Sequence, residues 1–205
     1  PDGPLAIVAD GVAFKRYPSC TGTHPAVDAV LAIRADEGIA AGDVRSVRVG
    51  TTPEVPGELV HPRPAGGAQA KFSMPFAVAV ALTYGGLGIE HFSDRLVADG
   101  AITALMDRCE VFVDLDLDRP AGVRAPAASV EITTVDGRRH RRRVDLALGN
   151  PGNPMPRSEL VGKFRACAGR RLEDAERVTA LLECVDAIEQ ADDIGRLMAA
   201  ARGER

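Results

Sequence analysis

The chain has 205 residues, of which 45% are hydrophobic and 26% charged, and its formal net charge is −4. This composition is typical of a folded globular protein and excludes wholesale disorder. A net acidic chain is a poor candidate for non-specific nucleic-acid binding. The longest stretch without a charged residue, 72–89, contains a proline and several glycines, so we expect no membrane span.

The four cysteines form no CxxC pair and no spacing typical of a metal site. We therefore expect reduced thiols in a cytoplasmic protein, with no bound metal. The first residues lack a basic segment followed by a long apolar core, so we expect no secretory signal there.

Residues 1–22 are rich in proline and glycine and are expected to form an extended lead-in. Apolar residues then recur every three or four positions, which predicts a helix over 24–37. Thr23 is its expected N-cap and Gly38 its expected end, because hydroxyl side chains favour the first position and glycine the last.

Alternating apolar residues predict a half-buried strand over 43–51. The next segment, 52–69, contains four prolines and three glycines and is expected to be a long loop. The small apolar residues of 75–84 fit either a buried helix or a strand. We predict a helix, because Pro75 suits a first helical turn and Gly85 suits a helix end.

One or two short helices are expected over 90–108. Alternation predicts a strand over 110–116, and two more strands, 128–134 and 138–148, flank the hairpin signal Asp136-Gly137. We expect these three strands to form an antiparallel segment.

An arginine-rich run, RRHRRR at 138–143, lies on the second strand of this hairpin. We interpret it as the solvated face of the strand. The alternative, a basic hairpin that binds nucleic acid, would require salt-dependent binding through these arginines.

The C-terminal part predicts helices over 157–168, 172–189 and about 192–201. The second carries a continuous apolar stripe from Leu172 to Ile188. The fold class is therefore α+β, with a largely antiparallel sheet of about four strands covered by helices and followed by C-terminal helices.

The chain contains 22 arginines but only 3 lysines, and each lysine lies in one of three distinctive segments. The first, 14–25, joins Lys15 and Arg16 to a phenol, a thiol and His24 at the start of a helix. Such a segment can receive a carboxylate or a phosphate. A capped helix with a solvated Lys-Arg pair is the structural alternative, and Cys20 is either an activated thiol or a buried inert one.

The second segment, 70–77, places Lys71 and Ser73 before an apolar helix, with Phe72 and Phe76 on one face. This four-residue aromatic spacing also fits plain core packing. The third segment, 149–164, is rich in turn residues. Most of it is explained by a structural role, because its prolines end the hairpin and lead the chain into the next helix.

Together the motifs FKRYPSC with the following TH, AKFSMPFAVAVAL, and GNPGNPMPRSELVGKF resemble the MmgE/PrpD family. Its members include 2-methylcitrate dehydratase, cis-aconitate decarboxylase and iminodisuccinate epimerase-like enzymes. The resemblance covers the chain from about residue 12 to the C-terminus. It implies that residues 1–155 form an α+β lid domain, and that residues 156–205 are helices that return to a helical domain in longer, full-length members.

The resemblance also implies a site between these two domains that uses no metal or organic cofactor. Lys15 matches a lysine that faces the substrate carboxylates. Cys20 falls where the decarboxylase-like branch has a histidine, His24 belongs to a Thr-His pair, and Phe76 falls where many members have a tyrosine. These four are the candidate catalytic residues, and the candidate substrate-binding residues are Lys15, Arg16, Tyr17, Lys71 and Ser73.

The resulting hypothesis is the C-terminal portion of a cofactor-independent lyase or isomerase that acts on a small polycarboxylate. The expected partners are this substrate and a helical domain or a second copy of the chain. The resemblance implies that the acid–base residues come mainly from the helical domain, so we expect the chain to be inactive alone. A non-catalytic remnant, or a subunit that needs a separate helical partner, is the alternative.

Overall fold

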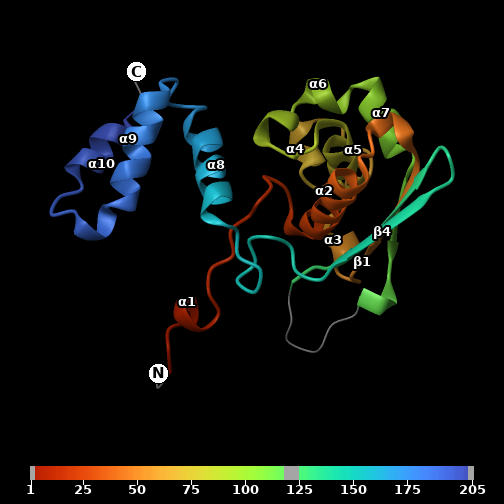
Figure 1. Cartoon of the computed structure of the whole chain (residues 1–205), viewed down its shortest axis with the longest axis horizontal. Coiled ribbons are helices and arrows are strands. Elements are labelled where there is room, and N and C mark those ends of the chain that lie inside the picture. Colours follow the sequence, from red (N-terminus) through yellow and green to blue (C-terminus); the bar gives the residue numbers. More distant parts are fainter. Residues whose placement is uncertain (1–2, 118–124, 203–205) are drawn as a thin grey trace. The chain divides into compact units, whose positions relative to one another are not determined.

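The computed structural model describes residues 3–117 and 125–202, and the chain forms two compact units, Pro1–Pro154 and Met155–Arg205 (Figure 1). The first unit combines a sheet with helices, and the second is helical. The outer ends of the two predicted domains, residues 1–2 and 203–205, lie outside the described residues.

The first unit contains four strands, β1 (Val44–Thr51), β2 (Cys109–Val113), β3 (Ala128–Thr134) and β4 (Arg139–Val144). Its α-helices are α1 (Ala6–Ala9), α2 (His24–Glu37), α3 (Val55–Glu58), α4 (Gly67–Ala70), α5 (Met74–Tyr84), α6 (Asp94–Val97) and α7 (Gly100–Met106). Short 3₁₀ turns lie at η1 (Thr21–Thr23), η2 (Ala41–Asp43), η3 (Ile89–His91) and η4 (Leu115–Leu117).

The sheet has the strand order β2-β1-β3-β4, in which the β1–β3 and β3–β4 pairs are antiparallel and the β1–β2 pair is parallel. The α+β class and the mostly antiparallel four-stranded sheet are thereby confirmed. The expectation that β2 joins β3 and β4 in one antiparallel segment is wrong. The chain between β1 and β2 crosses over through α3 to α7, and a helical crossover returns the chain in the same direction.

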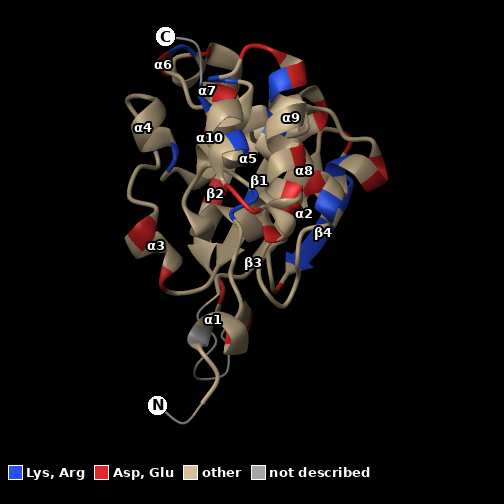
Figure 2. Ribbon diagram, turned by 90° about the vertical axis from the view of Figure 1, so that its left-hand side faces the viewer, with Lys and Arg blue, Asp and Glu red and all other residues tan. Residues whose placement is uncertain are grey.

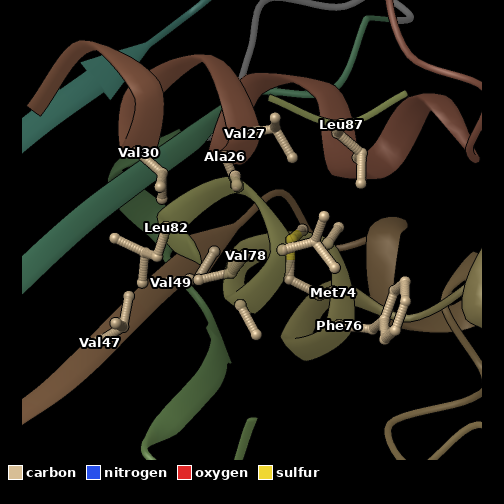
Figure 3. Close-up of a cluster of buried hydrophobic side chains, with 14 of the residues drawn as sticks. Ala26, Val27, Val30, Val47, Val49, Met74, Phe76, Val78, Leu82 and Leu87 are labelled. Carbon is tan, nitrogen blue, oxygen red and sulfur yellow. The ribbon is translucent and has the colours of Figure 1, made fainter. Parts of the chain in front are cut away.

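Helix α5 is the centre of the core, because every residue from Met74 to Leu82 is buried. Such a helix, apolar on all sides, must be surrounded by protein. Its side chains meet those of α2 and β1 in one cluster (Figure 3), which includes Ala26, Val27, Val30, Val47, Val49, Val78 and Leu82. The predicted helix of this segment is confirmed, with Gly85 in the left-handed conformation at its end.

Helix α2 begins and ends where the sequence predicts, and Gly38 ends it with a φ of 66°. Thr23 does not cap it, however, because its side chain makes no capping hydrogen bond. The Thr23 hydroxyl instead donates to the carbonyl oxygen of Cys20 and contacts the hydroxyl of Ser19. The predicted long loop 52–69 contains two short helices, α3 and α4, and the N-terminal lead-in contains α1.

One face of the sheet carries a row of alternating charges. The strand register aligns Glu110, Arg48, Glu131 and Arg141 across all four strands. Arg48 bonds to Glu110 at 3.0 Å, and Arg141 pairs with Glu131. This row is therefore charge-balanced.

Strand β4 carries four exposed arginines, at positions 139, 141, 142 and 143, and Figure 2 shows it in the colour of basic residues. Neighbouring carboxylates pair with several arginines of the run: Arg138 pairs with Asp136, Arg142 with Asp36, and Arg143 with Asp145. The Asp136-Gly137 turn is confirmed, with a φ of 89° at Gly137. The exposure and the pairing fit the solvated-face interpretation of this run.

The second unit contains α8 (Arg157–Ala168), α9 (Ala175–Asp186), the 3₁₀ turn η5 (Ile188–Gln190) and α10 (Gly195–Ala201). The predicted second helix is thus shorter than 172–189. Of the residues described in this unit, only Met155, Leu172 and Val178 are buried. Val185 and Ile188 of the apolar stripe are 40% and 47% exposed.

None of the helices in the described ranges combines the length and the apolar character that crossing a membrane requires.

Candidate functional site

The three lysine-bearing segments begin to converge at the start of α2. The amide of Cys20, in the first segment, donates to the carbonyl oxygen of Lys71, in the second, at 2.9 Å. The amide of Phe14 donates to the carbonyl oxygen of Gly149, in the third, at 2.8 Å. Gly149 has a φ of 97°, a conformation that favours glycine, so the turn after the hairpin depends on this residue type. Residues far apart in sequence thus frame one region.

Asp28, one turn into α2, holds this region together. One of its carboxylate oxygens, Oδ1, accepts hydrogen bonds from the Tyr17 hydroxyl at 2.5 Å and from Arg16 at 2.9 Å. The other, Oδ2, accepts the backbone amide of Leu148 at 2.8 Å. The Asp28 side chain is only 11% exposed, so these charge-assisted bonds lie largely away from water. Arg16 and Tyr17, both candidate substrate-binding residues, are therefore engaged by Asp28.

A pocket of about 60 Å³ lies in the same region. Its polar lining includes Lys15, Thr21, His24 and Asn150, and its apolar lining includes Phe14 and Pro126. Lys15 is exposed, and its ammonium group donates to the carbonyl oxygen of Ser19 at 3.2 Å. With this one bond among the described residues, two of its three N–H groups are available to a ligand, since an ammonium has three donors.

His24 lies at the first position of α2 and is 3% exposed. Burial lowers its pKa from 6.5 to about 4, so the imidazole is neutral near pH 7. Its ring packs edge-on against Tyr17, with ring centroids 5.2 Å apart. Its Nε2 has no hydrogen-bond partner among the residues that the structure describes.

Cys20 is half-buried next to this pocket, and its thiol donates to a carboxylate oxygen of Glu58 at 3.4 Å. Burial, with the Glu58 carboxylate acting in the same direction, raises the pKa of the thiol. A raised pKa keeps the sulfur protonated and weakly nucleophilic, which favours the inert-thiol interpretation over the activated one.

The candidates of the second segment serve the fold rather than the pocket. Ser73 is fully buried at the N-cap of α5, where its hydroxyl accepts the amide of Phe76 at 3.3 Å. Phe76 is fully buried in the core, with its ring 5.8 Å from that of Phe92. Lys71 is half-buried and meets the first segment through its backbone carbonyl. None of these three residues lines the pocket.

Sequence reasoning missed Asp28 and Glu58. Asp28 carried a usable signal, because a carboxylate between Val27 and Ala29 lies inside the apolar stretch of a helix, one turn after His24. Glu58 carried none, because its contact with Cys20 spans 38 positions of the chain.

No group of three or more histidine, cysteine, aspartate or glutamate side chains within residues 3–117 and 125–202 is arranged to hold a metal ion.

Comparison with known proteins identifies a matching family. Residues 17–187 match the MmgE/PrpD C-terminal domain. The chain is also 24% identical over 196 residues to the cis-aconitate decarboxylase of Homo sapiens and 25% identical over 197 residues to that of Mus musculus. These matches cover 94% of the chain but only 40% of each relative, so the chain spans well under half of the length of these proteins.

Proposed function

The chain belongs to the MmgE/PrpD family, and from this premise we propose that it is the C-terminal portion of a cofactor-independent lyase or isomerase whose substrate is a small polycarboxylate. The observation that carries the proposal is the pocket at the start of α2, where the exposed ammonium of Lys15 lies beside the buried neutral imidazole of His24. Two relatives named as cis-aconitate decarboxylases support a lyase-type reaction.

The chemistry of this pocket suits such a substrate. Dehydration, decarboxylation and epimerisation next to a carboxylate all develop negative charge on a carbanion or an enolate. A fixed cation stabilises that charge more strongly in the transition state than in the ground state. In this proposal Lys15 binds one substrate carboxylate, and His24 makes a second polar contact.

The proton-transferring groups come from elsewhere. Cys20 is a protonated thiol of raised pKa, and Phe76 is a core residue without a hydroxyl, so neither is suited to move a proton near pH 7. We infer that the acid and base lie on the part of the protein that corresponds to the remaining length of the relatives. The exposed apolar side chains of α9 and η5 fit a surface that packs against such a part, or against a second copy of the chain.

This division predicts that the purified 205-residue chain shows no measurable turnover of 2-methylcitrate, cis-aconitate or iminodisuccinate. The assay follows product formation by NMR, with a full-length family member as the positive control. Robust turnover by the chain alone would refute the divided site. The alternative function, a non-catalytic remnant, predicts that no helical partner restores activity.

We also predict that Lys15→Ala lowers kcat/KM of the complete enzyme by about 10- to 100-fold, because it removes one charge-assisted hydrogen bond to the substrate. Lys15→Arg should restore only part of the rate, since the planar guanidinium is larger and differently hydrated. Steady-state kinetics and a thermal melt test both variants.

The matched control is Arg139→Ala, which removes an exposed cation from β4 in the same unit. It should leave kcat/KM and Tm almost unchanged. Wild-type kinetics in Lys15→Ala would contradict the proposed substrate contact, whereas a large fall in Tm would assign Lys15 a structural role.

A further inference from the structure

Two buried hydroxyl groups lie in the segment that carries Lys15, and the proposed function uses neither of them. Ser19 is 4% exposed, Thr23 is fully buried, and their side-chain oxygens are 2.8 Å apart. The Thr23 hydroxyl donates to the carbonyl oxygen of Cys20 at 2.8 Å. A hydroxyl has a single hydrogen, so the Ser19 hydroxyl is the donor in its contact with Thr23. The hydrogen bonds therefore run in one direction, from Ser19 through Thr23 to the backbone of Cys20.

These bonds enclose the peptide group that joins Ser19 to Cys20. The N–H of this peptide, the amide of Cys20, donates to the carbonyl oxygen of Lys71 at 2.9 Å. Its carbonyl oxygen, that of Ser19, accepts the ammonium of Lys15 at 3.2 Å. A peptide group is planar, so its N–H and its carbonyl turn together. Rotating the carbonyl away from Lys15 would therefore strain the hydroxyl bonds on both sides of the peptide and the bond to Lys71.

The bond to Ser19 affects Lys15 in two ways. A lysine side chain has a flexible four-carbon stem, and ordering such a side chain opposes the binding of a ligand. A fixed acceptor orders the ammonium before the ligand arrives. The acceptor is also a neutral carbonyl, so this bond orients the ammonium without cancelling its charge. Lys15 thereby keeps its full attraction for an anion at the pocket that it lines.

We propose that Ser19 and Thr23 are positioning residues, whose paired hydroxyls fix the Ser19 carbonyl and so hold the ammonium of Lys15 ready for a carboxylate. This inference rests on the proposed function and deepens it. Neither Ser19 nor Thr23 lines the pocket, so both act on the ligand through Lys15.

The first measurement needs no ligand. The chain has three lysines, so labelling with ¹⁵N-lysine gives a simple spectrum in which the Lys15 ammonium is assigned by its loss in Lys15→Arg. Thr23→Val keeps the shape of the side chain but removes the hydroxyl. At mildly acidic pH and low temperature, we expect the Lys15 ammonium of this variant to exchange its protons with water about threefold faster or more. Thr23→Ser, which keeps the hydroxyl, should behave as the wild type, and Lys163 in the second unit is the internal reference.

The second measurement is the affinity for tricarballylate, a small polycarboxylate, followed by the amide signals of Thr21 and Asn150 in the pocket lining. Thr23→Val should weaken binding by about 3- to 10-fold, the value of one hydrogen bond. In a Lys15→Ala background the same substitution should have no further effect, because the hydroxyl pair acts through Lys15. A general loss of structure would instead weaken binding in both backgrounds.

The matched control is Thr51→Val on β1. Thr51 is also fully buried, and its hydroxyl donates to the carbonyl oxygen of Phe112 at 3.3 Å, but it lies outside the pocket lining. This substitution should leave the Lys15 signal and the affinity unchanged. If Thr23→Val does not fold, Ser19→Ala removes the other hydroxyl, keeps the bond from Thr23 to Cys20, and provides the same comparison.

The possible failures are distinguishable. An unchanged Lys15 signal with unchanged affinity in Thr23→Val would overturn the positioning role and leave the proposed function standing. An equal loss of affinity with and without Lys15 would also overturn it, because the hydroxyl pair would then serve the fold alone. A wild-type chain that does not bind tricarballylate would refute the carboxylate pocket, and with it both the proposed function and this inference.

Discussion

Replacing Asp28 with alanine should lower the free energy of unfolding of the first unit by about 3–5 kcal/mol, the range seen when one partner of a buried ion pair is removed. The change removes an acceptor that three groups share: the Tyr17 hydroxyl, the Arg16 guanidinium and the Leu148 amide. Tyr17 is 4% exposed, so water cannot replace the lost bond without opening the packing around it.

The measurement is urea unfolding followed by tyrosine fluorescence. The chain has two tyrosines, Tyr17 and Tyr84, and no tryptophan, so the signal reports on the first unit. The control is Asp36→Ala on the same helix. Asp36 pairs with Arg142 at 2.6 Å, but its side chain is 60% exposed, so its loss should cost less than about 1 kcal/mol. Equal effects of the two substitutions would contradict the role of Asp28.

Asp28 also connects stability with the proposed activity. Its contacts fix Arg16, adjacent to Lys15, and Leu148, which lines the pocket. Asp28→Asn keeps an acceptor for Tyr17 but loses the charge that pairs with Arg16. We therefore expect Asp28→Asn to unfold less readily than Asp28→Ala and still to weaken ligand binding, because the pocket wall is no longer anchored.

Local signals in the sequence account for the elements that were predicted well. Helices 24–37 and 157–168 have the predicted bounds, since glycine or proline sits where each must begin or end. The hairpin follows from Asp136-Gly137, whose turn conformation is a property of those two residues. The partner of β2 depends instead on the path of some sixty residues, which alternation within one strand does not reveal.

The pocket was only partly predictable for the same reason. Lys15 and His24 are nine positions apart and were found together by the motif. Phe76 was also a candidate catalytic residue from the sequence motifs. However, α5 is apolar on all sides, so Phe76 lies in the core, away from the pocket. The Asp28 contact with Leu148 spans 120 positions, so nothing short of the folded structure reveals it.

The second large effect that we expect is acid destabilisation through His24. Its pKa is about 4 in the folded protein and 6.5 in an unfolded chain, chiefly because burial disfavours the charged imidazole. Between these values the unfolded state binds the extra proton and the folded state does not. Stability therefore falls as the pH falls from 6.5 toward 4, by about 3 kcal/mol over the window, since one pKa unit corresponds to about 1.4 kcal/mol.

Urea unfolding at a series of pH values, again followed by tyrosine fluorescence, measures this slope. The comparison is with His24→Gln, which cannot titrate and should lose most of the slope between pH 6.5 and 4. Asp136 does not interfere, because its hydrogen bonds to Thr134 and Arg138 lower its pKa to about 2, and its contribution is lost only at more acidic pH. An unchanged slope in His24→Gln would show that His24 is not buried in its neutral form. A slope that disappears would mean that His24 determines the acid stability of the fold, because the burial that keeps its imidazole neutral must be undone before the ring can be protonated.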